Sequence, residues 1–338
     1  MQRWILAVPR TSAWFLLLFY VAFTCLGTQL FFLPLRLLHR PTWRAVNRMV
    51  ESWWASYMVW VTENFSPSDE FVLVGDEVDA RRRENVVAIA NHQIYADWWY
   101  LWWVAHECGR EGDVKIILKH QIKLIPIFGW AMSFFEFLFL HRNWKRDAAQ
   151  IDRVTREYTH MPLWLLLFPE GTVHTTEARP GSVRHAERVG AYMPRELLLP
   201  RVAGIHAAMK NLREHVSAVY DFTIGYDGLE TSLDAERVHQ LKTIFFFNSP
   251  PKRIQINIHR INIADIPTEL DEFSTWLYGV FERKDKLMQQ FFKTGTMPGG
   301  NRRPLRRKAS MVPLVTASVV NCIVYSLLRQ YVLPLVWA

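Results

Sequence analysis

The sequence predicts an α/β fold, a mixed, largely parallel sheet flanked by helices, with membrane-embedded helices near both the N- and C-terminal ends. Two observations lead to this prediction. Apolar segments of strand length alternate with longer amphipathic segments through the middle of the chain, and a long uncharged stretch lies near each end. Such alternation favours an α/β architecture, and about 20 apolar residues are enough for a helix to cross a bilayer.

The first uncharged stretch runs from Thr11 to Leu35, between Arg10 and Arg36. We interpret it as a retained anchor rather than a signal peptide, because no small-residue cleavage site follows it. A membrane hairpin is an alternative. In that case Pro34 turns the chain, and the segment from Trp53 to Val61 dips into the membrane interface.

The second uncharged stretch, Ser310 to Leu328, follows the basic run RRPLRRK, Arg302 to Lys308. Positive residues beside an apolar helix remain on the cytosolic side. We interpret the run as a membrane-contacting segment, with a solvated linker as the alternative. The sequence is therefore divided into an anchor with an interfacial helix (residues 1–62), a cytosol-facing domain (63–300), and a basic linker with a C-terminal membrane segment (301–338).

Composition supports work at a membrane surface. Of the 338 residues, 50% are hydrophobic, 15 are tryptophan, and the net charge is +8. Tryptophan favours the lipid headgroup zone, and basic residues favour anionic lipids. We therefore predict membrane lipids, and not nucleic acid, as partners, while protein partners are not predicted. The chain lacks an HExxH motif and spaced Cys/His clusters, so we predict no metal site and no cofactor.

The middle of the chain supplies the elements of the predicted sheet. The residues from Arg253 to Ile261 alternate between apolar and polar side chains, which is typical of a strand with one buried face. Strands are expected at Val86–Ala90, Val114–Leu118, Phe134–Leu140, Trp164–Phe168, Ser217–Ile224 and Arg253–Ile261. Helices are expected at Ala96–His106, Lys145–His160, Val183–Tyr192 and Asp271–Phe292.

The stretch NHQIYADWW carries a histidine and an aspartate, His92 and Asp97, directly after the apolar run VVAIA. On one continuous helix a spacing of five places two side chains about 140° apart. The pair therefore meets only if the chain turns between a strand ending near Ala90 and a helix beginning near Ala96. Asp97 can then accept from Nδ1–H and leave Nε2 as a base. The alternative is a surface histidine beside a helix-capping aspartate.

The motif FPEGT, residues 168–172, follows a second apolar run. Glu170 is a candidate to accept from substrate hydroxyl groups or to orient a cation. Gly171 permits a positive φ or a close backbone approach to a ligand. An ordinary turn after a strand is the alternative.

Three further segments supply cations. The apolar run FLFL closes in Arg142, whose guanidinium can bind phosphate in a bidentate manner. The run LLLPR ends in Pro200 and Arg201. In KIILKHQIK the lysines recur every four residues. They form one basic face if the segment is helical, whereas only Lys119 and Lys123 share it if the first half is a strand.

The order of these motifs resembles the eukaryotic lysophospholipid acyltransferase branch of the glycerolipid acyltransferase superfamily. The chain is similar to 1-acylglycerol-3-phosphate acyltransferases and lysocardiolipin acyltransferases over about residues 70–293. NHQIYADWW, IPIFGWAMSFFEFLFLHR, FPEGT and LLLPR are similar to the four motifs of that branch in turn. One difference is Val173, because the wider superfamily often has arginine after EGT.

The resemblance implies transfer of a fatty acyl group from acyl-CoA, a co-substrate, to the free hydroxyl of a lysophospholipid. Lysophosphatidic acid, lysophosphatidylinositol and lysocardiolipin all remain open as acceptors. His92 is expected to act as general base with Asp97, without an acyl-enzyme, and a backbone N–H near Gly171 is a candidate oxyanion donor. The substrate-binding candidates are Asn91, Lys119, Arg142, Glu170, Gly171, Thr172, Pro200 and Arg201.

Two other functions remain open on the same residues. One is a non-catalytic membrane protein that binds lipid or acts as a scaffold, and the other is a thioester hydrolase that uses the same base on water. The expected location is the endoplasmic reticulum membrane, with the catalytic domain facing the cytosol and a mitochondrial membrane as the alternative.

Overall fold

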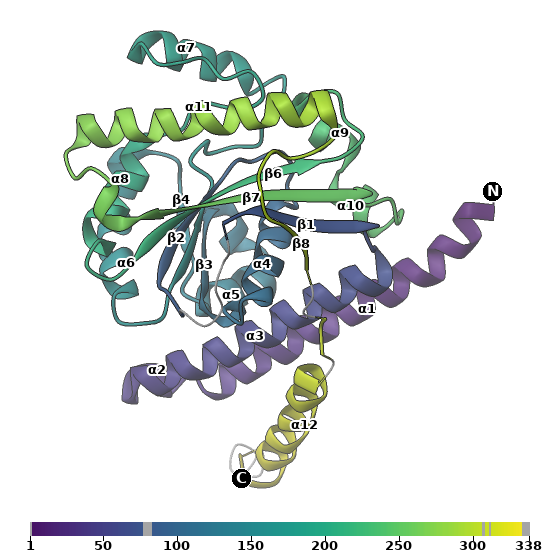
Figure 1. Ribbon diagram of the computed structural model, residues 1–338. Helices are drawn as coiled ribbons and strands as arrows, with labels where there is room; N and C mark the ends of the chain where they lie inside the picture. The colour runs from purple at the N-terminus through teal and green to yellow at the C-terminus, as the bar shows by residue number, and fades with distance from the viewer. Residues whose placement is uncertain (1, 77–82, 306–307, 311, 333–338) are drawn as a thin grey trace.

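The computed structural model describes residues 2–76, 83–305, 308–310 and 312–332. Its centre is one eight-stranded sheet with helices on both faces (Figure 1). The strands are β1 (Glu70–Gly75), β2 (Val86–Ala90), β3 (Val114–Lys119), β4 (Leu138–Leu140), β5 (Trp164–Leu167), β6 (Ala218–Tyr226), β7 (Arg253–Asn262) and β8 (Arg302–Pro304).

The strands lie in the order β4-β3-β5-β2-β6-β7-β1-β8. Neighbours from β4 to β6 are parallel, β7 is antiparallel to β6 and parallel to β1, and β8 is antiparallel to β1. The mixed, largely parallel sheet expected from the sequence is therefore confirmed. In a sheet of this kind the loops that leave the carboxyl ends of parallel strands gather at one edge, where ligands bind.

Helices form a layer on each face of the sheet. In Figure 1, α1, α3 and α4 lie below it, and α6, α8 and α11 lie above or beside it. The helices are α1 (Gln2–Phe31), α2 (Leu35–Leu38), α3 (Arg40–Phe65), α4 (Asp97–Glu107), α5 (Phe128–Phe134), α6 (Trp144–Tyr158), α7 (Arg179–Val189), α8 (Val202–Leu212), α9 (Ala235–Val238), α10 (Leu241–Phe245), α11 (Leu270–Thr294) and α12 (Val312–Leu327).

The two faces of the sheet support separate hydrophobic cores. Along β6, Tyr220 and Phe222 belong to the core that contains α1, α3 and α4. Val219, between Ala218 and Tyr220, belongs to the opposite core with α8 and α11. This division follows from the pleat, which points successive side chains to opposite faces.

Two sequence expectations about local structure are corrected. The strand expected over Phe134–Leu140 is only Leu138–Leu140, because α5 occupies the preceding residues up to Phe134. The basic run from Arg302, expected as a membrane-contacting segment or a solvated linker and not as a strand, begins with β8, which pairs with β1. Both elements depend on partners that are distant in the sequence, so local periodicity does not indicate them.

The segment from Trp53 to Val61, expected at the membrane interface, is buried in the core. It belongs to α3, whose side chains Trp53, Trp54 and Tyr57 are less than 10% exposed. α3 packs between α1 on one side and α4 on the other. Tryptophan therefore serves here as a large core residue rather than as an interfacial anchor.

Within the described part of the chain, α1 is the one helix that is long and apolar enough to cross a membrane. The span is Ser12–Phe31, by length and composition alone. α1 also packs against α3, α5 and α12, and 44% of its most apolar window is buried inside the protein. The second membrane helix expected at the C-terminus is not shown, because among the described residues only α1 meets the length and hydropathy of a membrane span.

Lys115 does not join a basic face, because it lies on β3 and is buried. Its Nζ lies 2.6 Å from Glu51 Oε2 on α3, and the two side chains are 4% and 0% exposed. This ion pair therefore fixes α3 to the sheet. Lys119 and Lys123 are exposed, as expected if the first half of the segment is a strand.

We predict that Lys115→Met lowers the free energy of unfolding by about 1–3 kcal/mol, because it leaves the buried Glu51 carboxyl group without its hydrogen-bond partner. Burial already raises the pKa of Glu51 to about 8, so in the variant the group takes up a proton rather than remaining as an unpaired charge. The matched control is the double variant Lys115→Met with Glu51→Leu, which removes both charges and should recover most of the loss. Unfolding in detergent, followed by tryptophan fluorescence, measures both values. Equal losses in the single and double variants would contradict the role of the unpaired Glu51 carboxyl group.

Candidate active site

The chain turns between β2 and α4, and this turn brings His92 and Asp97 together. His92 Nδ1 lies 2.8 Å from Asp97 Oδ2. Asp97 is the first residue of α4, as the spacing of five in the sequence requires. The aspartate side chain is 0% exposed, whereas that of His92 is 15% exposed and lines two adjoining cavities. His92 is therefore oriented by the buried Asp97 through Nδ1, and its ring is accessible from the two cavities.

Three further donors hold the Asp97 carboxylate. Oδ2 accepts from the backbone N–H groups of Gln93 at 2.6 Å and Ile94 at 3.0 Å, and Oδ1 accepts from the Tyr226 hydroxyl at 2.5 Å. These bonds stabilise the charged form and fix its direction. Sequence reasoning missed Tyr226, which is the last residue of β6 and reaches Asp97 only because β6 is the neighbour of β2.

The FPEGT segment supports the histidine from two directions. The Phe168 ring stacks on the His92 ring, with centroids 4.2 Å apart. Glu170 is buried, and its Oε1 accepts from the N–H of His92 at 2.8 Å, while Oε2 accepts from the N–H of Leu198 at 2.9 Å. Glu170 therefore connects the turn after β2 to the segment that leads to Pro200. This differs from the expected contact with substrate, because both oxygens face backbone donors.

Burial raises the pKa of the Glu170 carboxyl to about 8. The N–H groups of Leu198 and His92 and the nearby ammonium of Lys284 act in the opposite direction, because each favours the charged form.

Asn91 and Pro200 lie behind the site rather than in it. The Asn91 amide donates to the carbonyl of Ile224 at 3.0 Å and accepts from its N–H at 2.8 Å, which joins the end of β2 to β6. Asn91 and Pro200 are both buried.

Gly171 has a φ of +75°, and its N–H donates to the carbonyl of Phe168 at 2.9 Å. That N–H closes the turn, and the expected oxyanion donor, a backbone N–H near Gly171, stays a prediction.

The expected cations meet in a groove beside His92. The groove has a volume of about 200 Å³ and is lined by Lys119 at the end of β3, Arg142 after β4, and Arg201 before α8. Gly171 lines it as well, and an added Cβ there would lie 3.9 Å from Arg201 Cγ. Strand order β4-β3-β5 brings these residues together from three separate parts of the sequence.

A neighbouring cavity of about 230 Å³ leads from His92 in another direction. Its polar lining includes Lys119, Arg142 and Thr172, and Val173 also lines it, at the position where the wider superfamily often has arginine. Its apolar lining includes Trp98 and Leu118.

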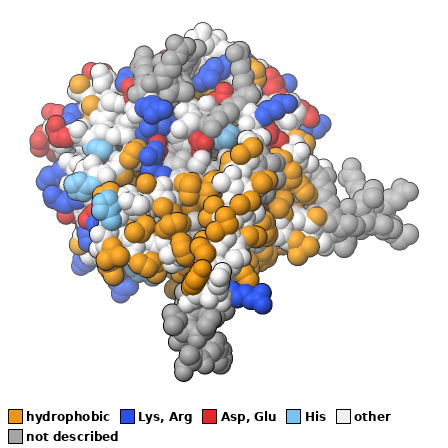
Figure 2. All heavy atoms as spheres, turned by 90° about the horizontal axis from the view of Figure 1, so that it is seen from below, with side chains coloured by type: hydrophobic (Ala, Val, Ile, Leu, Met, Phe, Trp, Pro, Cys, Tyr) orange, Lys and Arg blue, Asp and Glu red, His pale blue; other side chains and the backbone are white. Residues whose placement is uncertain are grey.

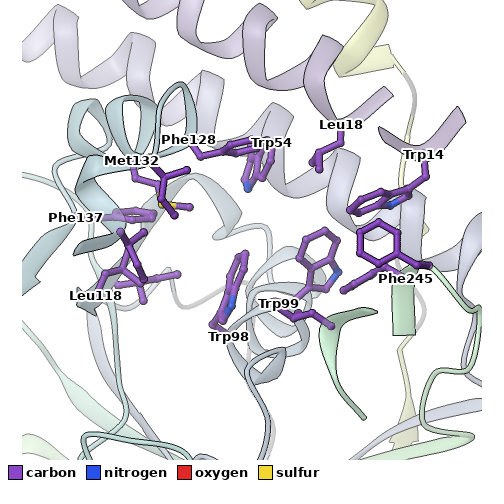
Figure 3. Close-up of a pocket in the computed structure, with 15 residues that line it drawn as sticks. Trp14, Leu18, Trp54, Trp98, Trp99, Leu118, Phe128, Met132, Phe137 and Phe245 are labelled. Carbon is purple, nitrogen blue, oxygen red and sulfur yellow. The ribbon is translucent and has the colours of Figure 1, made fainter. Parts of the chain in front are cut away.

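Trp98 and Leu118 also line an apolar pocket of about 420 Å³. Figure 3 shows Trp14 and Leu18 from α1, Trp54 from α3 and Phe245 from α10 around the same space. Because the two cavities share walls, the polar site around His92 adjoins an apolar space between α1 and the sheet. Sequence reasoning did not find this pocket, since its lining comes from segments far apart in the chain.

Two family models of known acyltransferases match this chain, and the first covers the region that contains this site. A family model described as Acyltransferase matches residues 72–226, and one described as Acyltransferase C-terminus matches residues 246–318. The chain belongs to the glycerolipid acyltransferase superfamily. In this member of the superfamily the two matched regions share one sheet, because β6 of the first pairs with β7 of the second.

Individual relatives are named as acyltransferases. The chain is 37% identical over 218 residues to an uncharacterised acyltransferase of Schizosaccharomyces pombe, covering 64% of this chain and 62% of the relative. It is 33% identical over 250 residues to a 2-acyl-1-lysophosphatidylinositol acyltransferase of Saccharomyces cerevisiae, covering 63% of each. It is 28% identical over 287 residues to 1-acyl-sn-glycerol-3-phosphate acyltransferase 2 of Brassica oleracea, covering 84% and 71%. The matched region thus spans less than two thirds of the first two relatives.

The raised pKa of Glu170 predicts a pH-dependent stability. Its folded-state pKa of about 8 lies above the ordinary 4.5, so the folded state binds an extra proton between these values. The free energy of unfolding therefore falls as pH rises through this range. In Glu170→Gln the slope should be shallower by up to about 1.4 kcal/mol per pH unit. Unfolding in detergent across this pH range tests it, and parallel slopes in the two proteins would contradict the assignment.

Proposed function

We propose that this protein is an acyl-CoA-dependent O-acyltransferase that moves a fatty acyl group onto the free glycerol hydroxyl of a lysophospholipid. The observation that carries the proposal is the accessible His92, oriented by Asp97 at 2.8 Å, between a cationic groove and an apolar pocket. Lysophosphatidic acid, lysophosphatidylinositol and lysocardiolipin are the candidate acceptors. Two relatives are named for lysophosphatidylinositol and acylglycerol phosphate, which agrees with the first two.

His92 is the base in the proposed reaction. An alcohol is a weak nucleophile at neutral pH, so Nε2 removes the hydroxyl proton as the oxygen attacks the thioester carbonyl. Asp97 stabilises the imidazolium that forms, because its carboxylate already faces Nδ1. The new C–O bond forms, the C–S bond breaks, and the coenzyme A sulfur leaves with the proton returned by His92. The acyl group passes directly to the acceptor, without an acyl-enzyme.

The groups around His92 suit the two ends of the substrates. Lys119, Arg142 and Arg201 present positive charge to phosphate, and guanidinium groups bind phosphate oxygens in pairs. The apolar pocket suits a fatty chain, since each buried CH₂ contributes about 0.8 kcal/mol. In this scheme the headgroups bind in the groove and an acyl chain lies among the tryptophans.

The proposed location is a membrane, most simply that of the endoplasmic reticulum with the active site facing the cytosol. The apolar span of α1, Ser12–Phe31, supports membrane attachment. Basic residues that follow this span support a cytosolic domain, because positive charge favours that side. A mitochondrial membrane is the alternative.

We predict that His92→Ala and Asp97→Asn each lower the rate of acyl transfer about 10²–10⁴-fold, the usual contribution of a general base. Coenzyme A release from labelled acyl-CoA, with and without lysophospholipid, measures the rate. Each variant must retain the wild-type unfolding temperature and membrane association. A wild-type rate in His92→Ala would falsify the assignment of the base.

The same assay separates the two alternative functions. A lipid-binding or scaffold protein releases no coenzyme A, and its lipid binding survives both substitutions. A thioester hydrolase releases coenzyme A without any lysophospholipid acceptor.

We predict that Arg142→Ala raises the KM for a phosphate-bearing substrate roughly tenfold or more, since a hydrogen bond to a charged group contributes about 1.5–3 kcal/mol. The KM for lysophospholipid and for acyl-CoA, measured separately, identifies the phosphate that Arg142 binds. The matched control is Arg146→Ala on α6, an exposed arginine outside both cavities that adjoin His92. Unchanged KM values for both substrates would remove Arg142 from the binding site.

A further inference from the structure

Two short segments expose large apolar side chains close to the apolar pocket. In residues 124–130, Leu124, Ile125 and Trp130 are 69%, 47% and 54% exposed. In residues 241–247, Leu241 and Phe247 are 41% and 50% exposed. Clustered exposure of this kind is uncommon on soluble monomers and marks a surface that contacts a partner or a membrane.

α1 joins these two segments into one apolar surface. The Phe15 ring of α1 stacks on Phe246 at 4.8 Å, and the Phe19 ring meets Phe128 at 5.8 Å. Phe15 and Phe19 are themselves about 40% exposed. Figure 2 shows the result, with hydrophobic side chains gathered across the underside of the molecule, where α1 lies.

The apolar pocket reaches the exterior on this surface. Of the side chains that line it, Ile125 and Leu241 are the exposed ones, while the others are buried or half-buried. The first belongs to the 124–130 segment and the second to the 241–247 segment. The pocket therefore opens between the two segments, beside α1.

The chemistry of this surface fits a phospholipid leaflet better than a protein. It is continuous with α1, whose Ser12–Phe31 span has the length and hydropathy of a membrane helix. Each segment also carries an exposed lysine at its edge, Lys123 and Lys242. A lysine there can keep its apolar stem in the lipid while the ammonium reaches anionic headgroups.

We propose that residues 124–130 and 241–247 insert into the bilayer beside α1 and form a lateral entrance, through which a lipid chain passes from the leaflet into the apolar pocket. The entrance rests on the proposed acyltransferase function, whereas insertion of the two segments does not. α1 is then both an anchor and one side of the entrance, since Trp14 and Leu18 line the pocket.

Insertion is tested by fluorescence, without reference to activity. The full-length protein carries Cys322→Ser, which removes the exposed thiol and leaves two buried ones. A single cysteine then replaces Leu124 or Phe247 and is labelled with an environment-sensitive dye. In phosphatidylcholine–phosphatidylserine vesicles, doxyl-labelled lipid should quench both dyes at least twofold more than a dye at Val189, a matched control that is 41% exposed on α7. Equal quenching at all three positions would overturn the proposal.

The entrance is tested with charged variants. Leu124→Glu and Phe247→Glu should lower acyl transfer to a long-chain lysophospholipid in vesicles tenfold or more, while transfer between short-chain, water-soluble substrates stays within twofold. The matched control, Val189→Glu, should leave both rates unchanged. Wild-type rates on the vesicle substrate in both variants would overturn the entrance. If the wild-type protein transfers no acyl group to either acceptor, the proposed function fails instead, and dye quenching still decides insertion.

Discussion

The buried Asp97 carboxylate is the constraint on which the rest of the site depends. A buried charge is costly unless hydrogen bonds compensate for the lost water. Here four donors do so: His92 Nδ1, the N–H groups of Gln93 and Ile94, and the Tyr226 hydroxyl. Three of them belong to the turn between β2 and α4, so the turn is folded around the carboxylate. The direction of the histidine ring is therefore set by the need to satisfy Asp97.

A second buried carboxylate extends this organisation to the other loops. Glu170 accepts from the backbone of His92 and of Leu198, and so joins the FPEGT segment, the turn after β2 and the segment before Arg201. The two acids thus hold the backbone, while His92 and the exposed cations Lys119, Arg142 and Arg201 line the groove. This division separates the residues that shape the site from those that face its cavities.

The N-terminal helices pack into the same hydrophobic core as one face of the sheet. α3 lies in the core, with Trp53 and Trp54 less than 10% exposed. α1 lies alongside α3 and contributes Trp14 and Leu18 to the apolar pocket. A helix apolar enough for a bilayer therefore also forms one wall of the space next to His92. The apolar span and one wall of the pocket are consequently supplied by the same helix.

The sequence by itself determined the α/β architecture, the positions of most central strands, and the meeting of His92 with Asp97. Each of these follows from local periodicity, or from a spacing that only a strand–turn–helix can satisfy. Only the tertiary structure decided that Tyr226 completes the site, that Glu170 faces backbone, that Lys115 is buried against Glu51, and that tryptophans from α1, α3 and α4 enclose a pocket. These contacts join residues far apart in the chain. They depend on strand order and helix packing, and no pattern within one segment carries that information.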